Sequence, residues 1–250
     1  MTPRSGTSRH AKWDIWPREV ARLVTVAHGT RTTAGNLVAA RITADAGRRL
    51  GMPTTTSYVE LCEPLFADVV AATETPTVVV PLLLSTGFHL RQDLPTAVAA
   101  ATRRDLVRLG TGLGPDPLLA QAQAERLRDA GARPGQPVVL VAAGSSDPLA
   151  LDDLERATRL LAHAWGTPVR LATLTGLGPR PHSVVRAGDA VSPYLLATGH
   201  FHRKARAEAL ASGAGVVADV IGPHRRVVDL VCGRARALAA GPSASVSVPA

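Results

Sequence analysis

The sequence predicts an α/β fold in which two similar lobes, from an internal duplication, each hold a small parallel sheet flanked by helices. Short apolar runs typical of strands alternate with amphipathic helical patterns along the chain. Two sequence landmarks recur at nearly equal separations of about 110 residues. The 250 residues, 46% of them hydrophobic, are enough to bury two cores of moderate size.

The first half contains four strand-like runs with helical patterns between them. The expected strands are 23–27, 54–61, 77–84 and 106–109. The expected helices are 33–50, a segment that Pro64 opens, and 95–103. The run 77–84 is continuously apolar, which is typical of a strand that helices cover on both faces.

The second half repeats this pattern. The expected strands are 138–142, 169–174, 190–196 and 216–221, and the expected helices are 148–165, 202–210 and 225–238. Ser146 and Asp147 precede the first of these helices and are its N-cap candidates.

Two aligned segments support the duplication. The sequence from Val26 to Thr30 aligns with 141–145, a separation of 115, and the sequence from Pro81 to Gly87 aligns with 193–199, a separation of 112. We therefore expect an N-terminal lobe over 21–115 that carries the active site, a linking helix over 116–136 and a degenerate C-terminal lobe over 137–240. Residues 1–20 and 241–250 are expected to be flexible.

Composition excludes several classes of protein. The apolar content argues against disorder, and the longest apolar run, 78–84, is far too short to span a membrane. Only Cys62 and Cys232 are present, which argues against a disulfide framework or a cysteine-held cluster. No secretory signal is evident in the first 20 residues, so a cytoplasmic protein is predicted.

The net charge of +8 comes almost entirely from arginine, since the only lysines are Lys12 and Lys204. Codon usage in a GC-rich genome is one explanation, and an anionic partner is the other. Aromatic residues make up only 3% of the chain and no long basic run occurs, so nucleic acid is not the expected partner. A small polyanion fits better.

Three groups that can bind a metal follow three neighbouring strands. His28 comes directly after the first strand, Glu60 ends the second, and His89 lies just beyond the third. Because the carboxyl ends of parallel strands meet at one edge, these side chains are expected to converge. Two imidazoles and a carboxylate suit Fe(II), Co(II) or Zn(II) and leave coordination positions open. A hydrogen-bonded loop residue is the alternative interpretation for either histidine alone.

The second half keeps the loops but not these groups. Ala143 stands in the position of His28, Phe201 in that of His89, and Thr173 roughly opposite Glu60. This pattern predicts one surviving site after duplication. His200 and His202 leave an alternative open, because they could face the cleft from the corresponding loop or be solvated loop residues.

Taken together, the motifs resemble those of the sirohydrochlorin chelatases, which are class II tetrapyrrole metal chelatases. They are Ala27-His-Gly-Thr-Arg31, Val59-Glu-Leu-Cys-Glu-Pro64, Val80-Pro-Leu-Leu-Leu-Ser-Thr-Gly-Phe-His-Leu-Arg-Gln-Asp-Leu-Pro95 and Ala143-Gly-Ser-Ser-Asp-Pro148. The resemblance extends over about 23–238. Thr30 departs from the Ser usual in the first motif but keeps the hydroxyl.

The resemblance implies a two-lobed chelatase that inserts Fe(II), or next Co(II), into sirohydrochlorin without ATP, in siroheme or cobalamin biosynthesis. It implies that His28 and His89 are the catalytic, metal-handling pair and that Glu60 is the acidic partner, with Glu63 as the competing candidate. Glu60 is preferred because it is expected to belong to the strand.

The resemblance also implies a binding surface for the anionic tetrapyrrole. The expected substrate-binding residues are Arg31, Ser85, Thr86, Arg91, Arg203 and Lys204. No cofactor is expected beyond the divalent metal substrate, and no nucleic acid or membrane partner. The internal pseudo-dimer fits either a monomer or a homodimer. A metal- or tetrapyrrole-delivery protein without turnover is the alternative function.

Overall fold

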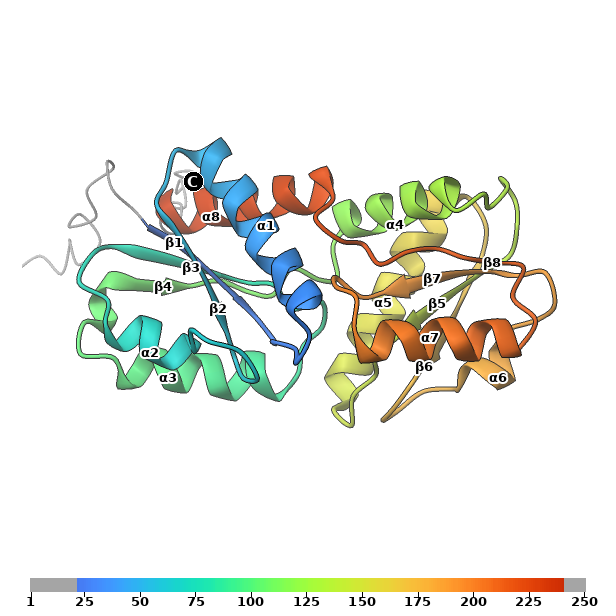
Figure 1. The fold of residues 1–250 in the computed structure, drawn as a ribbon, viewed down its shortest axis with the longest axis horizontal. Helices are drawn as coiled ribbons and strands as arrows, with labels where there is room; N and C mark the ends of the chain where they lie inside the picture. The colour runs from blue at the N-terminus through green and yellow to red at the C-terminus, as the bar shows by residue number, and fades with distance from the viewer. Residues whose placement is uncertain (1–21, 241–250) are drawn as a thin grey trace, which may run out of the picture.

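The computed structural model describes residues 22–240 and contains two four-stranded parallel sheets in two lobes that lie side by side (Figure 1). In the first lobe the strand order is β2-β1-β3-β4. Its strands are β1 (Arg22–Ala27), β2 (Thr54–Tyr58), β3 (Thr77–Pro81) and β4 (Val107–Leu109). The helical elements that connect these strands are α1 (Thr33–Leu50), α2 (Phe66–Ala71), a π-helical turn η1 (His89–Asp93), α3 (Leu94–Ala100) and a 3-10 turn η2 (Arg104–Leu106).

The second lobe has the equivalent strand order β6-β5-β7-β8. Its strands are β5 (Val138–Ala142), β6 (Val169–Thr173), β7 (Ala190–Tyr194) and β8 (Val216–Val217). The helices of this half are α4 (Pro117–Asp129), α5 (Pro148–Trp165), α6 (Pro181–Val184), α7 (His200–Ala211) and α8 (Arg225–Ala240). The repeated order confirms the predicted α/β class with two similar lobes.

Alternation along the central strands directs side chains to two different cores. In β1, Leu23 belongs to the largest apolar cluster, whereas Val24 and Val26 lie in a smaller cluster on the opposite face with Phe66 of α2 and Leu94 of α3. The second lobe repeats this arrangement, with its own small cluster beneath α6 and α7. Both faces of each sheet are therefore covered, as the unbroken apolar strands require.

The two lobes exchange a helix. Helix α8, at the C-terminal end of the described chain, packs against α1, β3 and β4, while α4 packs against α5 and β7 and also contacts α8 (Figure 1). The large apolar cluster accordingly runs through both lobes, from Leu23 in β1 through Leu127 in α4 and Leu140 in β5 to Val231 in α8. The segment 137–240 was expected to form the second lobe alone, but its last helix, α8, packs against the first lobe. The linking segment 116–136 contains α4, which packs against the second lobe.

Several strands end earlier than the apolar pattern predicts. Strand β2 was expected to reach residue 61 but ends at Tyr58, because the chain turns back and the backbone N–H of Tyr58 donates to the carbonyl of Pro64. Strand β3 was expected to reach residue 84 but ends at Pro81, because the carbonyl of Leu83 instead accepts from Leu113 and Gly114. Strands β7 and β8 are shorter too, and α6 and η1 were not predicted.

Between residues 22 and 240, none of the helices has the length and apolar character that crossing a membrane would need.

Candidate metal centre

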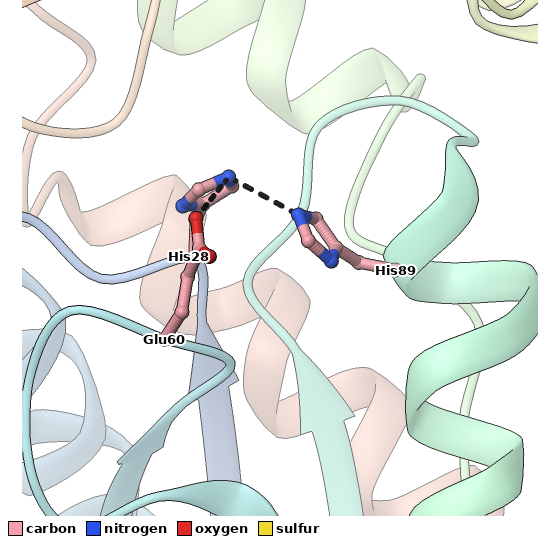
Figure 2. A group of neighbouring side chains, drawn as sticks. All are labelled: His28, Glu60 and His89. Carbon is pink, nitrogen blue, oxygen red and sulfur yellow. Dashed lines mark hydrogen bonds and ion pairs between the residues drawn. The ribbon is translucent and has the colours of Figure 1, made fainter.

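Two imidazoles and one carboxylate converge at the carboxyl edge of the first sheet (Figure 2). The Nε2 atoms of His28 and His89 are 3.2 Å apart, and His28 Nε2 is 3.6 Å from Glu60 Oε1. The rings meet edge to face, with centroids 4.7 Å apart. The structure therefore brings together the three residues that the sequence singled out, and all three potential ligand atoms lie within 4.8 Å of one another.

These distances suit a single metal ion. Two nitrogens bound to one ion at about 2.1 Å each, with an angle of about 90–110° between them, lie about 3.0–3.4 Å apart. The 3.2 Å separation of the two Nε2 atoms falls in this interval. The side chains of His28 and Glu60 are half exposed, at 51% and 50%, so an ion between them would keep open positions toward solvent or a second ligand.

The backbone after β1 and β2 aligns His28 with Glu60. The N–H of Glu60 donates to the carbonyl of His28 at 3.2 Å, which continues the ladder between the two strands beyond their ends. Gly29 makes this approach possible, because it has a φ of 96° and a Cβ there would lie 1.9 Å from the carbonyl oxygen of Glu60. The sequence-based reason for choosing Glu60 was wrong, since it lies two residues beyond β2, but the residue itself reaches the cluster.

Asn36 holds the loop that follows His28 through two hydrogen bonds, and this role was not predicted. Its Oδ1 accepts from the N–H of Thr30 at 3.0 Å, and its Nδ2 donates to the carbonyl of Thr30 at 2.8 Å. The Tyr58 hydroxyl donates to the carbonyl of Asn36. Burial, with a smaller effect from Cys62, raises the pKa of Tyr58, so this hydroxyl stays protonated and keeps donating.

His89 is the first residue of the π-helical turn, and Asp93 contacts the ring nitrogen, Nδ1, that does not face His28. Its Nδ1 lies 2.6 Å from Asp93 Oδ2, one helical turn further along. A neutral imidazole that donates its Nδ1–H to this carboxylate keeps the Nε2 lone pair directed at His28. Sequence reasoning missed Asp93 as a site residue, because the helix was expected to begin only at residue 95 and the turn that brings Asp93 to His89 was not predicted.

Glu63, the competing acidic candidate, accepts a hydrogen bond from the backbone of its own turn. Its Oε2 accepts from the N–H of Leu65 at 3.0 Å in the turn before α2. It is not part of the cluster with the two histidines.

The expected substrate-binding residues differ in their exposure and in the hydrogen bonds that they make. Arg31 and Arg203 are exposed, and Ser85 is half-buried. Arg91 instead donates to Asp147 Oδ2 at 2.8 Å, and the backbone N–H of Thr86 donates to Asp153 Oδ2 at 2.7 Å. Lys204 donates to the carbonyl of Leu174 at 3.3 Å and pairs with Glu208.

The corresponding edge of the second sheet repeats the backbone hydrogen bond beyond the strand ends but lacks the side chains of the first-lobe cluster. The N–H of Thr175 donates to the carbonyl of Ala143, so the position equivalent to Glu60 is Thr175. The expected equivalent, Thr173, is instead paired with Ala142, as Tyr58 is with Ala27 in the first lobe. Neither residue offers a carboxylate.

The two histidines of this edge do not join a metal group. His200 contacts the ring of Phe201 edge to face, and His202 is mostly buried with Nε2 3.7 Å from Asp219 Oδ1. Across residues 22–240, the cluster of His28, Glu60 and His89 is the one place where three or more potential ligand atoms gather.

Comparison with known proteins gives matches over both lobes. The CbiX family model matches twice, at residues 22–130 and 137–238. The chain is 32% identical over 193 residues to the sirohydrochlorin ferrochelatase of Bacillus subtilis, covering 70% of this chain and 73% of that protein. It also resembles two solved structures of SirB from this species. One, with Fe3+, has a TM-score of 0.77 and 26% identity, covering 88% of this chain and 96% of that one.

The second structure is the sirohydrochlorin chelatase SirB of subspecies spizizenii in complex with cobalt. It has a TM-score of 0.76 and 25% identity, covering 89% of this chain and 97% of that one. The two family matches fall on the two halves of the duplication, and the first includes all three clustered side chains. This chain therefore belongs to the CbiX family of sirohydrochlorin chelatases.

Proposed function

We propose that this protein inserts a divalent metal, Fe(II) before Co(II), into sirohydrochlorin without ATP. The observation that carries the proposal is the convergence of His28, Glu60 and His89 at one sheet edge. The name of the 32% identical Bacillus subtilis relative, sirohydrochlorin ferrochelatase, supports the same reaction.

The proposed ligands suit a metal that must be held and then released. Neutral imidazoles bind borderline divalent ions without forming a permanent cage, and the Glu60 carboxylate offsets part of the charge. Insertion into the macrocycle displaces two pyrrole N–H protons for each ion. An imidazole that has given up the metal can accept one of these protons near neutral pH. We assign this exchange to His28 and His89.

The loops and helix starts that follow the strands of both sheets suit a flat apolar ring with an anionic rim. Six exposed large apolar side chains lie in loops after strands or in the first two turns of the following helices: Leu37, Leu61, Phe88, Leu149, Leu177 and Phe201. They come from both lobes. The exposed Arg31 and Arg203 belong to the same set of loops and helix starts and would pair with rim carboxylates.

The choice of metal is a finer part of the proposal. Two histidines and a carboxylate accept Fe(II) and Co(II) alike, so availability decides between them. The SirB structures with Fe3+ and with cobalt support both. We place the reaction in siroheme biosynthesis first and in cobalamin biosynthesis second.

The test is an anaerobic insertion assay. Sirohydrochlorin is mixed with Fe(II) or Co(II), and the change in its absorbance spectrum is followed with and without the protein. We expect the protein to accelerate the change, and His28→Ala and His89→Ala each to slow it by about 100-fold or more. His163→Ala, at an exposed histidine in α5, is the matched control. A spectrum that changes no faster than without protein, while the macrocycle still binds, would favour a delivery protein instead.

A further inference from the structure

The chain segment that carries His89 is attached to the second lobe on both sides of that residue. The Leu84 carbonyl accepts from the Tyr194 hydroxyl at 3.0 Å, and the Thr86 N–H donates to Asp153 Oδ2 at 2.7 Å. After His89, the guanidinium of Arg91 donates to Asp147 Oδ2 at 2.8 Å. Within the described part of the chain, the hydrogen bonds that join 84–87 to anything beyond 84–91 both go to the second lobe.

The contact at Thr86 is made by a charged acceptor next to a buried group. Asp153 lies in α5 and is half-buried. Tyr194 ends β7 and is buried, and burial, followed by the charges of Asp153 and Asp116, raises its pKa well above the usual range. Its hydroxyl is therefore a permanent donor to Leu84. A hydrogen bond from a backbone N–H to a carboxylate is stronger than one to a neutral acceptor.

Asp147 serves two partners at once. It is the N-cap of α5 and was one of the two candidates in the sequence, with Oδ1 accepting from the N–H of Leu149. Its other oxygen receives Arg91. The side chain of Asp147 is only 15% exposed, whereas that of Arg91 is 53% exposed, so the carboxylate is held in place while the guanidinium reaches it from the surface.

The other two members of the cluster are held differently. His28 and Glu60 are joined by the backbone ladder of the first lobe itself. The position of His89 relative to them thus depends on how segment 84–91 is held, and the three hydrogen bonds named above, at Leu84, Thr86 and Arg91, connect that segment to the second lobe.

We propose that Asp153 and Asp147 are positioning residues, through which the second lobe sets the separation between the His89 and His28 imidazoles. The proposal rests on the metal-handling role of the cluster given above. It assigns a task to the degenerate lobe in the first step of the reaction, which is capture of the ion. Neither aspartate touches the ion, and each acts through segment 84–91.

The test measures binding of Co(II) alone to the full chain, by calorimetric titration and by the visible d–d absorption bands, which report ligand geometry. Asp153→Ala removes the acceptor of the Thr86 N–H and should weaken Co(II) binding about tenfold and change the bands. Asp153→Asn keeps an acceptor oxygen and should restore most of the affinity. Asp152→Ala, at the exposed neighbour in the same helix, is the matched control.

Asp147→Ser provides a second, independent variant. Serine keeps the N-cap of α5 but loses the ion pair with Arg91, so it should change the Co(II) bands without lowering the melting temperature much. It decides the question if Asp153→Ala does not fold. Variants at both positions that match the Asp152→Ala control in affinity and spectrum would overturn the proposal. Absence of Co(II) binding by the unaltered protein would instead overturn the proposed function.

Discussion

At the level of single residues, the two imidazoles of the cluster are not equivalent. His89 is held through Nδ1 by Asp93, whereas the contacts of His28, with Glu60 and His89, are made through its Nε2. His28 is also the more exposed ring, at 51% against 31%. In the proposed reaction, His89 would therefore be the more firmly oriented of the two ligands, because a second contact holds its ring through Nδ1.

Removing the carboxylate behind His89 should weaken metal capture. Asp93→Ala is expected to lower Co(II) affinity by about 10–100-fold, because the ring loses the partner that fixes its tautomer and orientation. Calorimetric titration measures this directly. Asp68→Ala, at an exposed acid in α2, should bind Co(II) like the unaltered protein. Equal affinities for the Asp93 and Asp68 variants would contradict this role.

The two acidic candidates can be separated by matched substitutions. Glu60→Gln keeps the side-chain size but removes a charge, and it should weaken Co(II) binding by about tenfold or more, since the attraction between one negative charge and a doubly charged ion about 4 Å away is about 2 kcal/mol even in a water-like dielectric. Glu63→Gln keeps an oxygen for the Leu65 N–H and should bind normally. The reverse result would assign the acidic role to Glu63.

The sequence could predict the three clustered residues because each follows a strand of one parallel sheet, and that topology is readable from apolar runs. It could not predict Asp93, because its role depends on the π-helical turn that brings it to His89 Nδ1. Nor could it show that Arg91 is engaged by Asp147, since that contact joins residues 56 positions apart in different lobes.

At the level of elements, His224, the residue just before α8, makes contacts whose stabilising effect depends on pH. His224 Nδ1 accepts from the N–H of Arg226, and Nε2 lies 3.1 Å from Glu125 Oε2 in α4. Burial lowers the pKa of His224, with Arg126, Arg225 and Arg226 acting in the same direction and Glu125 opposing them. A proton on Nδ1 would also face the N–H of Arg226. The fold therefore favours the neutral imidazole.

This contact predicts a loss of stability in mild acid. The unfolded chain takes up a proton at His224 near the ordinary pKa of 6.5, whereas the folded chain does so only at lower pH. The contribution of His224 is thus complete above pH 6.5 and is lost as the pH falls through the lowered value. His224→Asn keeps an acceptor and should flatten the decline in the free energy of unfolding between pH 7.5 and 5.5.

Urea unfolding at the two pH values measures the effect, with His163→Asn as the exposed control. A slope that is unchanged in His224→Asn would contradict it. Glu125 acts in the same sense at lower pH. Although burial alone would raise its pKa, its hydrogen bond with Arg226 and the neighbouring positive charges lower it overall. Its contribution is present above about 4.5 and is lost as the pH falls through the lowered pKa.

At the level of the whole molecule, the exchange of α4 and α8 makes one folding unit from two lobes. The helical pattern of each segment shows that an apolar face exists but not which sheet covers it, so the sequence could predict both helices and not their exchange. In the structure, α8 covers the sheet that carries His28, Glu60 and His89, and α4 covers the other. The large apolar cluster continues from one lobe to the other through both helices.

This shared core predicts a single unfolding transition. Leu127→Ala in α4 and Leu230→Ala in α8 remove buried side chains and should each destabilise the protein by about 2–5 kcal/mol, with both lobes unfolding together. Leu210→Ala, at a half-exposed position in α7, should change stability by less than about 0.5 kcal/mol. Differential scanning calorimetry that separates into two transitions, of which only one moves, would contradict the shared core.

The central claim, that His28, Glu60 and His89 hold the metal before transfer, is tested most directly by anomalous X-ray scattering from crystals grown with Co(II) and no macrocycle. We expect one strong cobalt peak within about 2.0–2.3 Å of both Nε2 atoms and a Glu60 oxygen. A cobalt peak elsewhere, such as beside His202 and Asp219, with the first-lobe cluster empty at saturating Co(II), would contradict the claim.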